Sequence, residues 1–252
     1  MARRPAHWAI RDRLSPQARV RIRRIADPLL APLGSLRSVA EAGPRLALTF
    51  DDGPDPRHTP GILDALAGHG VRATFFMLAG RAEQAPGLAR RVAAEGHEIA
   101  LHGADHQRLT RLPAAEVQAR IRGGRDRLER LVERPVHWFR PAFGAQSVRT
   151  WLVARRAGLQ VVVWTADLRD WTEQTPAAVA LAGLGAAASG AILLLHDGIV
   201  TDPADPTPEP GFDRARAADL LLTRLRDAGW EPGSVGELVD AGRPVRSAWF
   251  RP

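Results

Sequence analysis

From residue 45 onward, short apolar runs alternate with stretches of helical pattern, and this alternation constrains the fold more than any other feature. The predicted strands cover residues 45–50, 72–78, 97–101, 136–139, 159–165 and 190–195, with a shorter one after residue 229. The predicted helices cover residues 59–69, 82–95, 113–133, 147–157, 175–188 and 213–228. Strands rich in Val, Leu and Ile between helices predict a parallel α/β sheet covered by helices. Six or seven such units predict a TIM-like barrel, complete or incomplete, rather than an open doubly wound sheet.

The composition excludes several classes of protein. The chain contains no cysteine, so it can form neither disulfides nor thiolate metal sites, and any metal must be held by His, Asp or Glu. No glycine-rich phosphate loop follows the first predicted strand, which argues against a nucleotide-binding fold. No apolar run approaches the roughly 20 residues of a membrane-spanning helix, and the basic N-terminus lacks the apolar core of a secretory signal peptide. We therefore expect a cytoplasmic or peripheral membrane protein.

The positive charge is concentrated at the N-terminus. The whole chain carries a net charge of +7, and residues 1–45 hold ten arginines against three acidic residues. The remainder is neutral overall, which argues against a specific nucleic-acid-binding domain. We predict a basic N-terminal extension over residues 1–44 and one catalytic domain over residues 45–252. The extension is interpreted as a helix packed on the barrel, with weak contact to an anionic surface as the alternative.

Polar residues follow the predicted strands where each apolar run ends. In parallel α/β folds these carboxyl ends meet at one edge, where functional sites collect. Two adjacent carboxylates at the end of a buried strand are costly unless a metal, an arginine or a proton offsets their charge. The candidate residues at the strand ends are Asp51, Asp52, His102, His106, Arg140, Asp167, Asp170 and His196. Two histidines four residues apart with one carboxylate from another strand form the three-ligand set expected of a catalytic zinc site.

These motifs resemble those of the polysaccharide deacetylases of carbohydrate esterase family four. That family has the motifs T-F-D-D-G-P, H-[ST]-x-x-H, R-P-P-Y-G, D-x-x-D-W and L-x-H. The corresponding segments here are residues 49–54, 102–106, 140–144, 167–171 and 194–196. The resemblance extends from residue 45 to about residue 230. It implies a distorted (β/α) barrel with about seven parallel strands and a metal-dependent hydrolase that removes acetyl groups from sugars.

The resemblance also implies a role for each matching residue. Asp52, His102 and His106 would hold one divalent metal, usually Zn²⁺ and sometimes Co²⁺ or Ni²⁺. Asp51 would be the general base that takes a proton from water, and Arg140 would keep Asp51 ionised and oriented.

The remaining motifs would complete the chemistry. His196 would be the general acid that protonates the leaving amine, with Asp170 preferred over Asp167 as the carboxylate that raises its pKa. The backbone N–H of Phe143 would donate to the developing oxyanion. Trp171 and Leu194 would line the acetyl pocket and the groove.

Two positions depart from the family pattern. Gly103 replaces the usual Ser or Thr, and we expect its missing hydroxyl to weaken metal binding. Ala142 replaces a proline, and we expect it to loosen the loop that carries Phe143. The Pro-rich segment 202–210 follows His196 and is predicted to wall one side of the groove.

The sequence thus predicts a monomeric deacetylase that acts on N-acetylated amino sugars, such as oligosaccharides or cell-wall glycan. One alternative is a carbohydrate O-acetyl esterase, because the same machinery cleaves both bonds. A second is a glycan-binding member of the family without turnover. A third is attachment to a membrane or to nucleic acid through residues 1–44.

Overall fold

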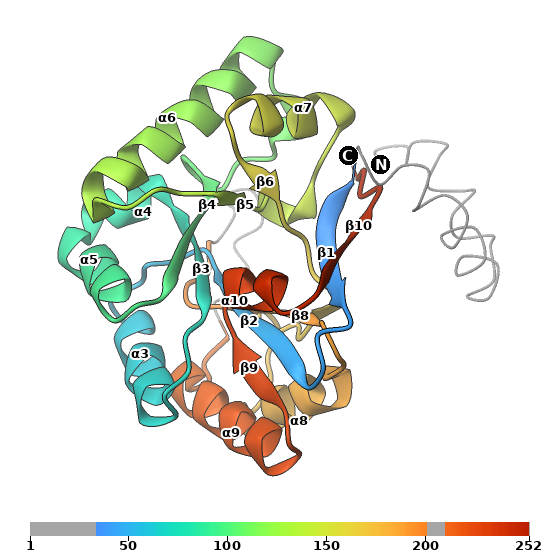
Figure 1. Ribbon diagram of the computed structural model, residues 1–252. Helices are drawn as coiled ribbons and strands as arrows, with labels where there is room; N and C mark the ends of the chain where they lie inside the picture. The colour runs from blue at the N-terminus through green and yellow to red at the C-terminus, as the bar shows by residue number, and fades with distance from the viewer. Residues whose placement is uncertain (1–33, 201–209, 252) are drawn as a thin grey trace, which may run out of the picture.

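The computed structural model describes residues 34–200 and 210–251, and its central feature is a curled parallel sheet (Figure 1). Seven strands follow the order β6-β5-β4-β3-β2-β8-β7, and β9 pairs in parallel with β2. The strands of this sheet are β2 (Arg45–Asp51), β3 (Thr74–Leu78), β4 (Glu98–Gly103), β5 (Trp138–Phe139), β6 (Gln160–Val161), β7 (Ala166–Asp167), β8 (Ile192–His196) and β9 (Glu231–Gly233). This arrangement confirms the predicted barrel-like α/β fold with about seven parallel strands.

Helices cover the outside of the sheet (Figure 1). They are α3 (Thr59–Gly68), α4 (Ala79–Gln84), α5 (Pro86–Ala94), α6 (Ala114–Val132), α7 (Val148–Arg156), α8 (Pro176–Ala186), α9 (Arg214–Asp227) and α10 (Val235–Asp240). Local signals explain several of their starts: Thr175 and Asp213 cap α8 and α9 through their side chains, and a capping box at Ser147 begins α7. The predicted helix 82–95 is divided, because Pro86 begins a new helix there.

The side chains of β2 alternate between two apolar layers, as the two-residue period of a strand requires. Leu46, Leu48 and Phe50 belong to the cluster shared with the surrounding helices. Ala47 belongs to a second cluster, together with Phe76 of β3. The side chains of Thr49 and Asp51 lie on the same face of β2 as Ala47. The carboxylate of Asp51, the last residue of the strand, therefore lies on the inner face of the barrel.

A two-stranded ladder packs against the sheet between the segment that follows β6 and the segment that precedes β8. β1 (Ser35–Ala40) pairs antiparallel with β10 (Arg243–Ser247), and Figure 1 shows the two strands side by side. Leu36 of β1 bridges to Val162 just after β6, and the Val39 amide donates to the carbonyl of Gly190 just before β8. Both apolar side chains are buried in the second cluster.

This ladder includes part of the predicted N-terminal extension. Residues 35–40, which the sequence predicts as part of that extension, form a strand that pairs with β10, and two of their side chains lie in the second cluster. We therefore propose that the catalytic domain begins before residue 45. Residues 1–33, which carry most of the basic charge, and residues 201–209, which make up most of the predicted groove wall, lie outside the described residues. Among the helices of the described ranges, none combines the length and the apolar character needed to cross a membrane.

Candidate active site

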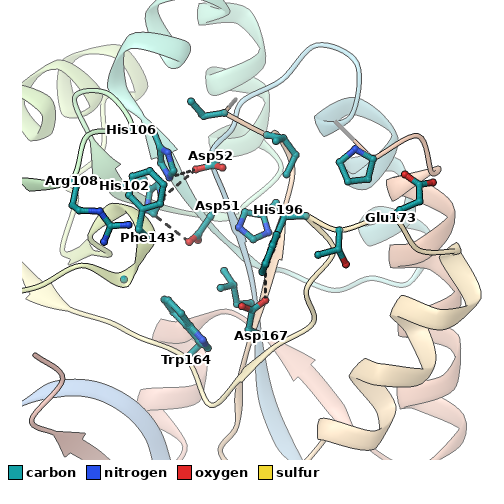
Figure 2. A pocket seen from close by; sticks show the side chains of 17 residues that line it. Asp51, Asp52, His102, His106, Arg108, Phe143, Trp164, Asp167, Glu173 and His196 are labelled. Carbon is teal, nitrogen blue, oxygen red and sulfur yellow. Dashed lines mark hydrogen bonds and ion pairs between the residues drawn. The ribbon is translucent and has the colours of Figure 1, made fainter. Parts of the chain in front are cut away.

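Three potential metal ligands meet at the carboxyl end of the sheet (Figure 2). Asp52 follows β2 directly and has a positive φ of 75°. His102 lies in β4, and His106 lies in the loop after it. Asp52 Oδ1 is 3.3 Å from Nε2 of His102 and 3.3 Å from Nε2 of His106. One ligand atom from each of the three residues lies within 4.8 Å of the others.

The surroundings of this cluster fit a divalent metal ion. Asp52 Oδ1 is buried and has no hydrogen-bond partner within the described residues, so a cation would satisfy it. Burial opposes ionisation of Asp52, but His102 and His106 outweigh it and hold the pKa of that carboxyl below its usual range. Burial lowers the pKa of His106 to about 4, which keeps its imidazole neutral and able to coordinate. One carboxylate and two imidazoles leave coordination positions for water and substrate.

Asp51 has a different set of partners from its neighbour. The fully buried Arg140 follows β5, and its Nη1 donates to Asp51 Oδ1 at 2.6 Å and to Thr49 Oγ1 at 2.8 Å. Its guanidinium lies 3.9 Å from the centroid of the Phe76 ring, which holds the charged plane in place. Asp51 Oδ2 is 3.8 Å from Nδ1 of His102. Asp51 is therefore oriented by an arginine and faces the metal cluster.

His196 ends β8 and is held by a buried carboxylate. Asp170 Oδ1 is 2.7 Å from Nδ1 of His196, and Asp170 Oδ2 accepts from the His196 backbone N–H at 2.8 Å. Burial alone would lower the pKa of His196, but the charge of Asp170 and its hydrogen bond outweigh burial and raise that pKa to about 9. The imidazole is therefore protonated at neutral pH and can donate a proton. The second candidate partner, Asp167, accepts instead from the backbone N–H of Arg169.

These groups open into a pocket of about 870 Å³, which is large enough for a sugar substrate. Half-exposed Phe143 and Trp171 line it, as does the buried Leu194. The ring of Phe143 lies 4.2 Å from the ring of His106, so this aromatic wall adjoins the metal cluster. Trp164 lines the pocket too and packs edge-on against Trp249.

The structure brings all ten predicted site residues to one place. Eight of them line the pocket: Asp51, Asp52, His102, His106, Phe143, Trp171, Leu194 and His196. Arg140 and Asp170 lie behind it, each bonded to a lining residue. The two departures from the family pattern also lie beside the site, since Gly103 ends β4 and Ala142 begins the 3-10 turn Ala142–Gly144.

The sequence reasoning missed several supporting residues. Arg214, at the start of α9, is buried, and its Nη1 donates to Asp170 Oδ2 at 3.2 Å. Arg81 donates to the Asp52 carbonyl at 3.1 Å and to the Ile199 carbonyl at 2.8 Å, which ties the loops after β2 and β8 together. In a chain with so many arginines, no local signal separates these two from arginines on the surface.

A further missed residue is Asp197, directly after His196. Its Oδ1 accepts from the Gly53 amide at 3.1 Å, and its Oδ2 lies 2.6 Å from the Thr59 hydroxyl. Burial is the main reason why the pKa of Asp197 is raised to about 7. The adjacent histidine and glycine in a His-Asp-Gly triplet were the only sequence signal that could have drawn attention to it.

Fold and site together define a class of protein: a (β/α) barrel with a candidate Asp-His-His metal site at the carboxyl ends of its strands, flanked by a carboxylate and a histidine. The chain belongs to the polysaccharide deacetylase family. The family model described as polysaccharide deacetylase matches residues 39–162.

Similar proteins with curated names support this membership. The chain is 37% identical over 204 residues to a chitooligosaccharide deacetylase of Sinorhizobium fredii, a match that covers 79% of this chain and 94% of that protein. It is 36% identical over 215 residues to the peptidoglycan-N-acetylglucosamine deacetylase PgdA of Listeria monocytogenes, with 84% of this chain covered. That match spans only 42% of the Listeria protein, so this chain corresponds to part of it.

A solved structure has the same fold. The Bc1960 peptidoglycan N-acetylglucosamine deacetylase superimposes with a TM-score of 0.75 at 27% sequence identity. The superposition covers 88% of this chain and 98% of that one.

Proposed function

We propose that this protein removes acetyl groups from N-acetylated amino sugars in a metal-dependent hydrolysis. The observation that carries the proposal is the placement of three kinds of group around one pocket. Asp52, His102 and His106 form the metal site, Asp51 and its arginine lie on one side of it, and His196 with Asp170 provides the acid. The named relatives, which are peptidoglycan and chitooligosaccharide deacetylases, support the same reaction.

Asp51 is assigned the role of general base. Asp52, His102 and His106 would hold a divalent ion, which we propose to be Zn²⁺ with Co²⁺ or Ni²⁺ as substitutes, and such an ion would lower the pKa of water and polarise the acetyl carbonyl. Asp51 accepts the proton that water loses as it attacks this carbonyl carbon. The bond from Arg140 keeps Asp51 correctly oriented for that step.

His196 is assigned the role of general acid. Its imidazolium donates a proton to the sugar nitrogen as the carbon–nitrogen bond breaks, so acetate and a free amine leave. Asp170 supplies the charge that keeps His196 protonated, and Arg214 orients Asp170. The backbone N–H of Phe143 donates to the developing oxyanion, and a donor of this kind contributes about 10²–10³ in rate. Trp171 and Leu194 shape the acetyl pocket and the groove.

The function is tested by measuring acetate release from N-acetyl and O-acetyl sugars, oligomers and polymers, with purified protein and added Zn²⁺. Release from an N-acetylated glycan is the expected result. Turnover of O-acetylated sugars alone would identify a carbohydrate esterase instead. The matched variant is Asp51→Asn, which should retain Zn²⁺ but lose turnover, and full activity in this variant would overturn the base assignment.

A further inference from the structure

The turn that carries Phe143 has a strained backbone. Phe143 has a left-handed φ of 59°, and Gly144 after it has a φ of 60°. A residue with a Cβ rarely adopts this conformation and keeps it only where surrounding contacts hold it. The Gly144 amide donates to the Pro141 carbonyl at 2.9 Å, but this bond lies within the turn itself. Contacts from elsewhere in the chain therefore have to fix the position of the turn.

Trp249 provides such a contact from a segment far away in the sequence. Its indole Nε1 donates to the Gly144 carbonyl at 3.0 Å, and the Trp249 side chain is buried. Its ring packs edge-on against Trp164, with the ring centroids 5.1 Å apart. A Cβ on Gly144 would lie 2.6 Å from the Trp164 ring, so this ring lies directly against the turn. The two indoles therefore hold Gly144 through one hydrogen bond and one close packing contact.

Gln146 holds Trp249 in place. Gln146 is buried, and its side-chain amide donates to the Trp249 carbonyl at 2.7 Å and to the Ser35 hydroxyl at 3.0 Å. Backbone hydrogen bonds of 2.7 and 2.8 Å join Gln146 and Arg251 in both directions. The segment after β10 is thus tied to the chain just beyond the turn. These contacts act against the loosening that we expect from Ala142.

The turn lies where the proposed reaction needs an accurately placed donor. Phe143 and Trp164 both line the pocket, and Figure 2 shows Phe143 beside His106 of the metal cluster. A donor to the oxyanion is effective only within hydrogen-bond reach of the oxygen, so a small shift of the turn weakens it. Trp249 is not among the described residues that line the pocket, so it would affect the reaction through the turn.

We propose that Trp249 is a positioning residue for the deacetylation. Its indole N–H fixes the Gly144 carbonyl and thereby holds the backbone N–H of Phe143 where it donates to the developing oxyanion. This inference rests on the proposed function, because the Phe143 amide has this role only if an acetyl carbonyl is attacked in the pocket. Trp249 lies outside the sequence motifs that define the site.

The first test is Trp249→Phe, which removes the indole N–H and keeps an aromatic ring in the core. With Zn²⁺ and an N-acetylated chitooligosaccharide, we expect kcat to fall about tenfold and KM to change by less than about twofold, because the oxyanion exists only in the transition state. Trp151→Phe is the matched control. Trp151 is also buried, and its indole N–H has no hydrogen-bond partner within the described residues, so this variant should keep the wild-type kcat.

A second substrate separates the positioning of the donor from a general loss of active protein. The carbonyl carbon of a trifluoroacetyl group is more electrophilic and its oxyanion is less basic, so its hydrolysis depends less on a hydrogen-bond donor. In Trp249→Phe the loss of kcat should therefore shrink to about two- to threefold with an N-trifluoroacetyl chitooligosaccharide. An equal loss with both acyl groups, or an unchanged kcat, would overturn the inference.

Hydrogen exchange tests the positioning without any turnover. The amides of Gly144 and Ala145 both donate within the turn, so they exchange only when the turn opens. In Trp249→Phe we expect both amides to exchange about five- to tenfold faster, measured by NMR, because the turn has lost one external hydrogen bond. Trp151→Phe should leave both rates unchanged.

Gln146→Met displaces the same contact from its other side, because it removes the amide that holds Trp249. It should also speed exchange at Gly144 and Ala145, and it takes the place of Trp249→Phe if that protein does not fold. Unchanged exchange in the folded variants would overturn the inference. Faster exchange in a protein whose wild type releases no acetate from any glycan would overturn only the proposed function.

Discussion

Two adjacent aspartates in this site acquire separate surroundings because the backbone turns between them. Asp51 ends β2 and bonds to Arg140, whereas Asp52 has a left-handed φ of 75° and contacts two imidazoles. Asp is one of the few residue types that tolerate this conformation. The turn therefore allows one Asp-Asp pair to supply both the proposed metal ligand and the proposed base.

The titration of His196 should depend on Asp170. The carboxylate raises the pKa of His196 to about 9, above its ordinary 6.5. The protonated form thus stabilises the fold fully below about pH 6.5, and this contribution is lost as the pH rises through about 9. In Asp170→Asn burial is opposed only by the weaker charges of Asp52 and Asp51, so the pKa should fall well below its wild-type value. An NMR titration of metal-free protein measures this shift.

Asp167→Asn provides the control for that titration, because Asp167 bonds to the Arg169 amide and not to His196. In Asp167→Asn the pKa of His196 should stay near the wild-type value. An unchanged pKa in Asp170→Asn would show that another group sets the protonation of His196.

Gly103 should resist replacement by the serine that the family uses. Its φ is +145°, a conformation that L-residues rarely adopt, and a Cβ there would lie 2.8 Å from the Asp105 carbonyl oxygen. We expect Gly103→Ser to lose about 1–3 kcal/mol of unfolding free energy and to weaken Zn²⁺ binding, even though it restores the hydroxyl. Chemical denaturation and zinc titration test both effects.

Gly123→Ser is the matched control for this substitution. Gly123 lies in α6, where a Cβ would meet nothing within 4 Å, so this variant should keep wild-type stability. If Gly103→Ser instead bound zinc more tightly than the wild-type protein, the missing hydroxyl would affect zinc affinity more than the backbone strain at residue 103 does.

At the scale of elements, β1 completes the barrel wall. It contacts residue 162, just after β6, on one side and residue 190, just before β8, on the other. The short β6 and β7 have few ladder bonds of their own, so the β1–β10 pair supports this side of the sheet.

Leu36→Ala should therefore be strongly destabilising. Leu36 is 1% exposed, and deleting a buried leucine side chain costs about 2–5 kcal/mol. The control is Leu181→Ala in α8, where the side chain is 59% exposed and the expected change is within about 0.5 kcal/mol. Urea unfolding measures both, and equal stability of the two variants would contradict the placement of β1 in the core.

At the scale of the whole molecule, metal binding should stabilise the fold, because the three ligands come from β4 and from the loops after β2 and β4, which only the folded chain brings together. Zn²⁺ at about 100 times its Kd should add about 2.7 kcal/mol and raise Tm by roughly 5–10 °C. A chelator should reverse the shift.

Two histidine variants test where this stabilisation arises. His102→Gln should lose the Zn²⁺-dependent rise in Tm, and His137→Gln, an exposed histidine outside the site, should keep it. A shift that survives in His102→Gln would place the stabilising ion elsewhere on the protein.

The sequence by itself determined the parallel barrel-like fold and the candidate ligands, because strand and helix periodicity and the order of polar residues at strand ends are local properties. It did not distinguish the buried Arg214 from surface arginines, nor identify β1 as a core strand. Only the tertiary structure decided that Asp170, and not Asp167, contacts His196. Such pairings join residues far apart in the chain, and the packing of strands and helices sets the distances between them.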